Sequence, residues 1–313
     1  MKKYLLTGLL FSLPLIVYFS FLLLIDPHNF ANVFHVISDS DKLKIIGRND
    51  ESSPRGNMLW KALEIKRNKI KSVIIGDSQG AHINMDLAEQ CSGEKIYNFC
   101  VPGASFDSFF KIFWFVADHQ PDLESVYFQV GFMNYNSYRE YCIFKFAQDY
   151  FDKPYLYFIT KENLNDALAN VKYQITKDPS ILQYSYEFQT IEEINKIAIH
   201  RLDLFFGDYT YPDHFFGEFV KIKEYCEQKN IKIRFVILPN YKDVDKYLAE
   251  NNLSGMMQRF KDDFNKLGNT IDLDVPCEIK NTREAYIDFF HIRQPYLDQL
   301  TKQIWGNPEL KVN

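Results

Sequence analysis

The stretch Ser72-Val73-Ile74-Ile75-Gly76-Asp77-Ser78-Gln79-Gly80 decides the fold. Its first half is an apolar, β-branched run typical of a buried strand, and its second half has the glycines and polar residues of a tight turn into a helix. Strand-like runs follow at residues 95–101, 125–130, 232–238 and 270–275, and helical patterns lie near 105–119, 214–229, 243–267 and 294–305. Strands and helices that alternate in this way predict an α/β fold with a parallel sheet between two helical layers.

One segment interrupts this alternation. Residues 137–212 are far longer than a crossover between parallel strands requires, are rich in Tyr and Phe, and are partly helical in pattern. An insertion at the carboxyl end of a strand lies where α/β sheets bind their ligands. We expect a helical, aromatic-rich insertion, with two roles open: it shapes a pocket or contacts a membrane neighbour, or it serves packing alone.

The N-terminus predicts a membrane anchor. Residues 4–25 carry no charge, Lys2 and Lys3 precede them, and Asp26 and Pro27 follow. As a helix, this run would be roughly 33 Å long, enough for a hydrocarbon core of about 30 Å. Lysines on the short leading side favour a cytoplasmic N-terminus, and the run is longer than the apolar core of a cleaved signal peptide. We therefore predict a transmembrane signal anchor within residues 1–28, a tether over 29–71 and an exported α/β domain over 72–313.

Composition narrows the function classes. The 313 residues include 36 Lys and Arg against 41 Asp and Glu, a formal net charge of -5. This balance argues against a basic face for nucleic acid. Five cysteines lack the spacing of a zinc or redox motif, and the phosphate-loop pattern is absent from the sequence. We therefore expect neither a cofactor nor a metal.

Residues able to carry acyl chemistry follow the predicted strands in order. Ser78 follows the first strand, Gly103 the second and Asn134 the third, while Asp288 stands three residues before His291 near the C-terminus. Taken singly, each has an ordinary interpretation as a helix cap, a turn residue or a chance pair. Together they predict a nucleophile, Ser78, a base, His291, and an orienting acid, Asp288. The N–H groups of Ser78 and Gly103 and the amide of Asn134 are the candidate oxyanion donors.

These blocks resemble the SGNH (GDSL-type) serine hydrolases, whose fold is a flavodoxin-like three-layer αβα sandwich. The first block matches Gly76-Asp77-Ser78, the second Gly103, and the last Asp288 and His291. The resemblance implies the triad Ser78–His291–Asp288 and covers residues 72–305. The third block departs from the family's Gly-x-Asn-Asp pattern, because Gly131-Phe132-Met133-Asn134 is one residue longer and lacks the aspartate. The oxyanion role of Asn134 is therefore open.

The predicted anchor, the Asp-Pro after it and the altered third block are similar to cell-envelope acyl-transfer proteins of the DltD type and to SGNH partners in polysaccharide O-acetylation. This resemblance implies a serine O-acyltransferase or esterase that moves groups such as acetyl or D-alanyl to an envelope polymer. It also implies an extracytoplasmic domain on the bacterial cytoplasmic membrane and a membrane acyltransferase of the MBOAT class as partner. Two alternatives stay open: a non-catalytic scaffold for such an acyltransferase, and a lipid esterase at the membrane surface.

Overall fold

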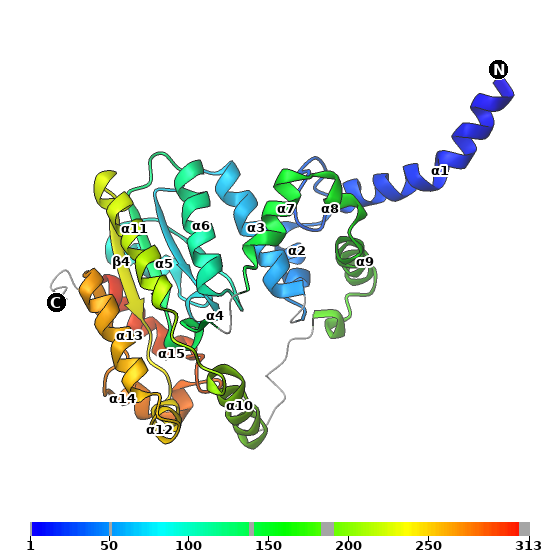
Figure 1. The fold of residues 1–313 in the computed structure, drawn as a ribbon. Helices are drawn as coiled ribbons and strands as arrows, with labels where there is room; N and C mark the ends of the chain where they lie inside the picture. Colours follow the sequence, from blue (N-terminus) through cyan, green and yellow to red (C-terminus); the bar gives the residue numbers. More distant parts are fainter. Residues whose placement is uncertain (1, 50–51, 138–140, 183–190, 307–313) are drawn as a thin grey trace. The chain divides into compact units, whose positions relative to one another are not determined.

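The computed structural model describes residues 2–49, 52–137, 141–182 and 191–306 (Figure 1). The chain forms two compact units, each built from two stretches of sequence. Unit 1 comprises Met1–Glu64 and Phe144–Tyr184, and unit 2 comprises Ile65–Ile143 and Ser185–Asn313. The residues singled out for chemistry all belong to unit 2.

Unit 2 contains a five-stranded sheet in which every strand pair is parallel. Its strands are β1 (Ser72–Gly76), β2 (Ile96–Cys100), β3 (Ser125–Val130), β4 (Lys232–Ile237) and β5 (Thr270–Asp272). All five predicted strands are present, and the last is shorter than predicted. Their order, β2-β1-β3-β4-β5, is that of flavodoxin-like doubly wound sheets. The prediction of an α/β fold with a parallel sheet is confirmed.

The strand order reverses between β1 and β3. Ser72 pairs with Ile96 of β2 on one side and with Ser125 of β3 on the other, so the three strands run in step. Every residue of β1 is buried, as expected for a central strand covered on both faces. Ligands of open α/β sheets bind outside the carboxyl ends of the strands at such a reversal, which is the point where β1 leads into Ser78.

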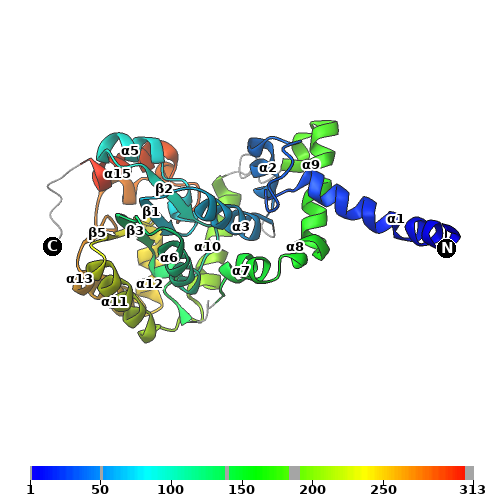
Figure 2. The ribbon, with the colours of Figure 1, turned by 90° about the horizontal axis from the view of Figure 1, so that it is seen from above.

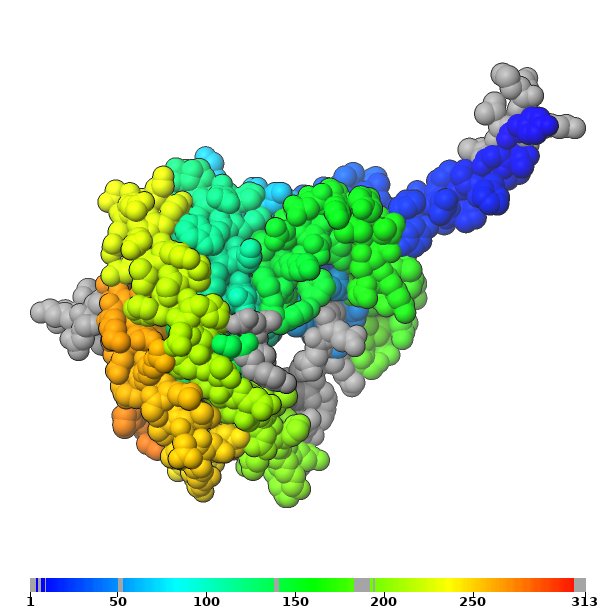
Figure 3. All heavy atoms as spheres, in the orientation of Figure 1, coloured from blue at the N-terminus to red at the C-terminus, as the bar shows by residue number. Residues whose placement is uncertain are grey.

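Helices cover both faces of the sheet (Figure 2). On one side lie α6 (Phe106–His119), α11 (Asp213–Gln228) and α13 (Ser254–Leu267), and on the other lie α5 (Met85–Ser92) and α15 (Gln294–Trp305). In the space-filling view, α11 and α13 (yellow and orange) lie side by side on the surface (Figure 3). The layer beneath them is aromatic: the Phe219 ring lies 5.4 Å from both Phe128 and Phe235, and 5.2 Å from Phe264. Much of the aromatic content therefore serves core packing.

The helix predicted over residues 243–267 is two helices, which corrects the sequence prediction. α12 (Lys242–Glu250) ends before Asn251, and α13 begins at Ser254. Asn252 between them has a φ of 59°, a left-handed conformation that does not continue a right-handed helix. The other short or inserted elements of unit 2 are α4 (Ser78–Ala81), η1 (Phe132–Asn134), α10 (Ile191–Phe206), α14 (Glu278–Asn281) and η5 (Arg283–Ala285).

Unit 1 is helical in its described part. Its elements are α1 (Lys2–Ile25), α2 (Asp39–Ile46), the first part of α3 (Ser52–Arg67), α7 (Phe144–Asp152), α8 (Tyr155–Ile159), α9 (Lys161–Thr176) and η3 (Pro179–Leu182). Asp166 of α9 is buried and pairs with Arg48, Arg55 and His28. The segment predicted as a helical insertion thus contributes α7 to α9 to unit 1 and α10 to unit 2.

The predicted membrane anchor requires a correction. Over the described residues, no helix is both long and apolar enough to cross a bilayer. The apolar run does form α1, but its last part belongs to the protein core: Leu22 and Ile25 are buried in a cluster with Ile37 and Ala167, and Tyr18 packs against it.

Candidate active site

The chain turns sharply between β1 and α4, and this turn exposes Ser78. Asp77 caps α4: its Oδ1 accepts a hydrogen bond from the N–H of Gln79 at 2.8 Å. Ser78 is the first residue of the helix, so its N–H has no carbonyl four residues earlier within the helix to receive it. The buried strand and the capped turn together hold a half-buried serine at the carboxyl edge of the sheet.

Asp288 and His291 lie on one tight loop. An antiparallel bridge between Tyr286 and Ile292 closes the loop, and the Ile287 N–H donates to the His291 carbonyl at 2.8 Å. Inside it, Asp288 Oδ1 accepts the N–H groups of Phe290 and His291, each at 2.8 Å. The carboxylate is therefore fixed by the backbone of its own loop.

The structure brings Ser78, His291 and Asp288 into one hydrogen-bonded line. His291 Nε2 lies 2.8 Å from Ser78 Oγ, and His291 Nδ1 lies 2.8 Å from Asp288 Oδ2. With a proton on Nδ1 held by the carboxylate, Nε2 is left as the acceptor for the serine hydroxyl. This is the geometry in which a histidine can take a proton from a serine.

Electrostatics in this line favour an ionised Asp288. Burial alone would raise the pKa of the Asp288 carboxyl, but the hydrogen bond and charge of His291 and the two backbone N–H donors outweigh it and lower that pKa. Burial would likewise lower the pKa of His291, and the hydrogen bond and charge of Asp288 outweigh it, so the pKa of His291 is raised. The acid thus stays charged while the imidazole remains able to gain and lose a proton.

The two further residues predicted for the oxyanion lie at the same sheet edge. The Val101 N–H donates to the Gly76 carbonyl at 2.9 Å, so the chain segments that follow β1 and β2 start side by side. Gly103 turns the second of them with a φ of 76°, a conformation that favours glycine. Asn134 ends η1, is buried, and donates from Nδ2 to Asp77 Oδ2.

A line of buried amides that the sequence analysis missed joins the serine turn to the histidine loop. Gln79 Nε2 donates to Asn240 Oδ1 and to the Phe290 carbonyl, both at 3.0 Å. Gln79 Oε1 accepts from Gln129 Nε2 at 3.1 Å, and Gln129 Oε1 accepts the Asp77 N–H at 3.0 Å. A polar Gln129 inside a largely apolar strand was the available signal. These contacts bind the loops after β1 and β4 to the loop of His291.

Arg201 is a further residue of the site that the sequence did not predict. Its Nη1 lies 2.8 Å from Asp288 Oδ2, the oxygen that also faces His291. Nothing in the sequence around it distinguishes this arginine from those on solvated helix faces. Its place in α10 brings a positive charge to the acid of the line.

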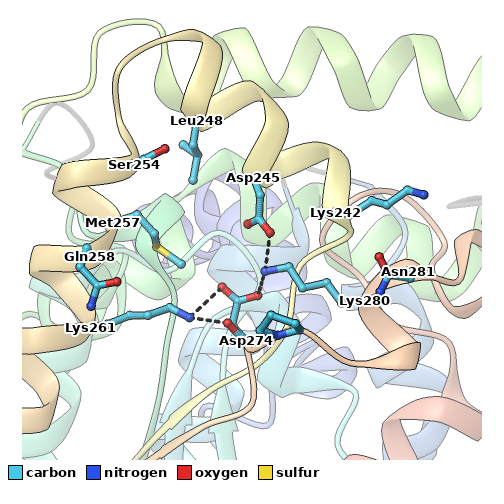
Figure 4. Close-up of a pocket in the computed structure, with 11 residues that line it drawn as sticks. Lys242, Asp245, Leu248, Ser254, Met257, Gln258, Lys261, Asp274, Lys280 and Asn281 are labelled. Atoms are coloured by element: carbon cyan, nitrogen blue, oxygen red, sulfur yellow. Dashed lines mark hydrogen bonds and ion pairs between the residues drawn. The ribbon is translucent and has the colours of Figure 1, made fainter.

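A pocket of about 420 Å³ lies beyond the carboxyl ends of β4 and β5, and its lining includes neither Ser78, His291 nor Asp288. At its floor Lys280 bridges Asp245 and Asp274, and Lys261 also pairs with Asp274 (Figure 4). Asp274 Oδ1 accepts the Asn240 N–H at 3.2 Å. These charges neutralise one another and tie α12, α13 and α14 together beside the amide line.

Comparisons with known proteins identify no family. No family model and no curated protein matches the chain. One solved structure that matches is described as "a putative platelet activating factor from Streptococcus pneumonia", with 10% identity and a TM-score of 0.37, covering 81% of this chain and 91% of that one. A likeness at this level carries no inference about activity, so the function must be argued from the chain's own residues.

Proposed function

We propose that the chain is a serine-dependent acyl hydrolase of the esterase type, with Ser78 as its nucleophile. The observation that carries the proposal is the pair of 2.8 Å contacts made by His291, from Nε2 to Ser78 Oγ and from Nδ1 to Asp288 Oδ2. A serine hydroxyl is a weak nucleophile unless an adjacent base removes its proton as it attacks. The two contacts supply both the base and the group that orients it.

The reaction proceeds in two halves through an acylated serine. Ser78 Oγ attacks the carbonyl carbon of an ester while His291 Nε2 takes the hydroxyl proton. The tetrahedral intermediate then collapses, and the leaving alcohol takes that proton from His291. Water, or an acceptor hydroxyl, next gives its proton to His291 as its oxygen attacks the acyl carbon, and Ser78 regains the proton when it leaves. Asp288 stabilises the imidazolium in both halves.

We assign the oxyanion to the N–H groups of Ser78 and Gly103, with the amide of Asn134 as a third donor. The left-handed turn at Gly103 and the start of α4 at Ser78 both lie at the carboxyl edge of the sheet. A primary amide has two hydrogens, so the bond from Asn134 to Asp77 leaves one for the oxyanion. Such donors stabilise the transition state because its oxygen carries more charge than the ester carbonyl.

The acyl acceptor is the finer part of the proposal. On the resemblance to envelope acyl-transfer proteins, we propose a hydroxyl of an envelope polymer as acceptor, an extracytoplasmic location and an MBOAT-class membrane acyltransferase as partner. Hydrolysis and transfer differ only in which hydroxyl enters the second half-reaction. A panel of acyl esters with and without a polyol acceptor distinguishes them: ester product supports transfer, free acid alone supports hydrolysis, and a preference for long chains supports the lipid esterase.

The experiment that tests the proposal is labelling of the full chain with a fluorophosphonate, read by intact mass. The native protein should gain one adduct, and Ser78→Ala and His291→Ala should gain none while keeping native circular dichroism. Ser254→Ala, which removes an exposed serine of α13, is the matched control and should label at the native rate. A native protein that stays unlabelled, or a folded Ser78→Ala that labels, contradicts the proposal and favours the non-catalytic scaffold.

A further inference from the structure

The carboxylate of Asp288 is surrounded by hydrogen-bond donors. Its Oδ1 accepts two backbone N–H groups of its own loop, and its Oδ2 lies 2.8 Å from both His291 Nδ1 and Arg201 Nη1. The side chain is only 2% exposed. Arg201 is thus a positively charged partner of the acid that orients His291, and it contacts the same carboxylate oxygen as His291 does.

The charges explain what this partner does. While His291 is neutral, the Asp288–His291 pair carries one negative charge in a buried site, and an uncompensated buried charge is costly. Arg201 compensates it. Once His291 takes a proton, the pair itself is neutral and Arg201 repels the new imidazolium. Arg201 therefore favours neutral His291, the form that can accept a proton from Ser78.

Among the described residues, the charged groups that act most strongly on His291 come from three elements. Asp288 comes from its own loop, Asp77 from the turn between β1 and α4, and Arg201 from α10. Both carboxylates favour the imidazolium, whereas the guanidinium opposes it. The arginine is thus the cation that offsets two acidic neighbours.

Helix α10 also contacts the loop that carries His291 and the segment just before that loop. These contacts hold the guanidinium of Arg201 in place. Phe205 and Phe206 pack on Phe290, with ring centroids 5.4 and 6.5 Å apart. Asn195 Oδ1 accepts hydrogen bonds from Arg283 Nε and Nη2, at 3.1 and 2.8 Å. Because these contacts lie along the same helix as Arg201, the position of α10 sets the position of the charge.

We propose that Arg201 is a positioning residue that keeps Asp288 ionised and aligned, and that it sets the basicity of His291 so that the imidazole stays a competent base at lower pH. The proposal rests on the proposed function for its catalytic meaning. It gives the predicted insertion a role in the site, because α10 lies within that segment. If α10 moved and withdrew Arg201 from Asp288, the pH at which the reaction rate rises would become higher.

The direct test is the pKa of the His291 imidazole, measured by NMR titration of the full chain. The chain has 7 histidines, and the His291 signal is the one lost in His291→Gln. Arg201→Gln and Arg201→Met remove the charge, and either should raise the His291 pKa by about half a unit or more. Arg201→Lys, which keeps the charge, should leave a smaller rise.

A matched control lies on the same helix. Lys196 of α10 is 73% exposed and pairs with Glu192, so Lys196→Met removes one positive charge without touching the site. It should leave the His291 pKa unchanged. An unchanged pKa in a folded Arg201→Gln or Arg201→Met, or an equal rise in Lys196→Met, overturns the proposal.

Labelling kinetics give the second readout and separate the two proposals. The fluorophosphonate labelling rate should rise with pH as His291 loses its proton. In Arg201→Gln and Arg201→Met this rise should occur at higher pH, in step with the raised His291 pKa, and the rates should approach the native rate at alkaline pH. If Arg201 were merely structural, its variants would lose the same fraction of the labelling rate at every pH. That result would contradict the proposal. If the native protein does not label at Ser78, the proposed function fails, while the titration still decides what Arg201 does to His291.

Discussion

The side-chain amide of Asn134 donates a hydrogen bond to the carboxylate of Asp77, the residue directly before the proposed nucleophile. Asp77 uses its other oxygen to cap α4, so one buried carboxylate holds both the serine turn and the amide. The third sequence block, which departs from the family pattern, thus still ends beside Ser78. Its extra residue is accommodated by η1, where Asn134 is the last residue.

We expect Asn134→Ala to slow acyl transfer to Ser78 by about 10²- to 10³-fold, because one oxyanion donor is lost. The measurement is the pre-steady-state rate with a small activated ester. Asn251→Ala, at an exposed asparagine that bonds Tyr247, should retain the native rate. A rate within threefold of native in folded Asn134→Ala would assign the amide a purely structural role on Asp77.

The close approach of α4 to β2 predicts a pair of coupled substitutions. A Cβ on Gly80 would stand 2.6 Å from Cys100 Sγ, a contact that neither side chain can accommodate without moving. We expect Gly80→Ala to destabilise the protein by about 1–3 kcal/mol, as overpacking does in other cores. In a Cys100→Ala background, where the sulfur is gone, the cost of Gly80→Ala should fall markedly.

The measurement is a double-mutant cycle of unfolding free energies in urea. Gly255→Ala, at a glycine in α13 whose added Cβ would meet open space, is the control and should be neutral or slightly stabilising. Additive effects of Gly80→Ala and Cys100→Ala would mean that the sulfur is not what excludes a side chain at position 80.

The amide line predicts that Gln79 supports the fold as well as the site. Gln79→Leu keeps the approximate volume but leaves Gln129 Nε2, Asn240 Oδ1 and the Phe290 carbonyl without their partner, and unmet buried polar groups are costly. We expect a loss of about 2–4 kcal/mol in unfolding free energy. Gln258→Leu, at an exposed glutamine of α13 that bonds Asp262, should change stability by no more than about 0.5 kcal/mol. Equal effects of the two substitutions would rule out the buried line as the cause.

The strands, and the three residues that the structure joins by hydrogen bonds, could be picked out from the sequence because both leave local patterns. Ser78 follows a β-branched run, and Asp288 and His291 share one short loop. Each of these patterns can therefore be recognised from a few neighbouring residues. Arg201 is 87 positions from Asp288 and meets it only through the fold. Asn240 was missed for the same reason, since its contacts with the other amides form only when the strand ends meet. Gln129 differs, because a polar residue inside a largely apolar strand is a local signal.

Two predictions differ from the structure, for different reasons. The N-terminal apolar run has the length expected of a membrane span, yet Leu22 and Ile25 at its end pack into the core of unit 1. The helical pattern over 243–267 is continuous, yet the Asn251-Asn252 pair breaks it. Paired asparagines tolerate a left-handed backbone and were a signal for a break. The helical periodicity of the segment was given more weight.

The last prediction concerns pH and stability. The pKa of Asp288 is lowered in the folded chain, so its contribution to stability is present above about pH 4 and fades as pH falls toward the lowered value. The pKa of His291 is raised, so its contribution is full below about pH 6.5 and fades as pH rises through the raised value. The pair therefore stabilises most between about pH 4 and 6.5, where the acid is ionised and the histidine protonated.

Asp288→Asn removes this pairing, and we expect the unfolding free energy to fall by about 2–4 kcal/mol inside that window, with a smaller loss on either side. Urea denaturation at a series of pH values measures the gap between native and variant. Asp262→Asn, at an exposed aspartate of α13, should show a gap that stays near zero at every pH. A gap for Asp288→Asn that does not change with pH would mean that Asp288 stabilises through its neutral hydrogen bonds and not through its charge. Such a result would argue against the role of Asp288 as an ionised acid that orients His291.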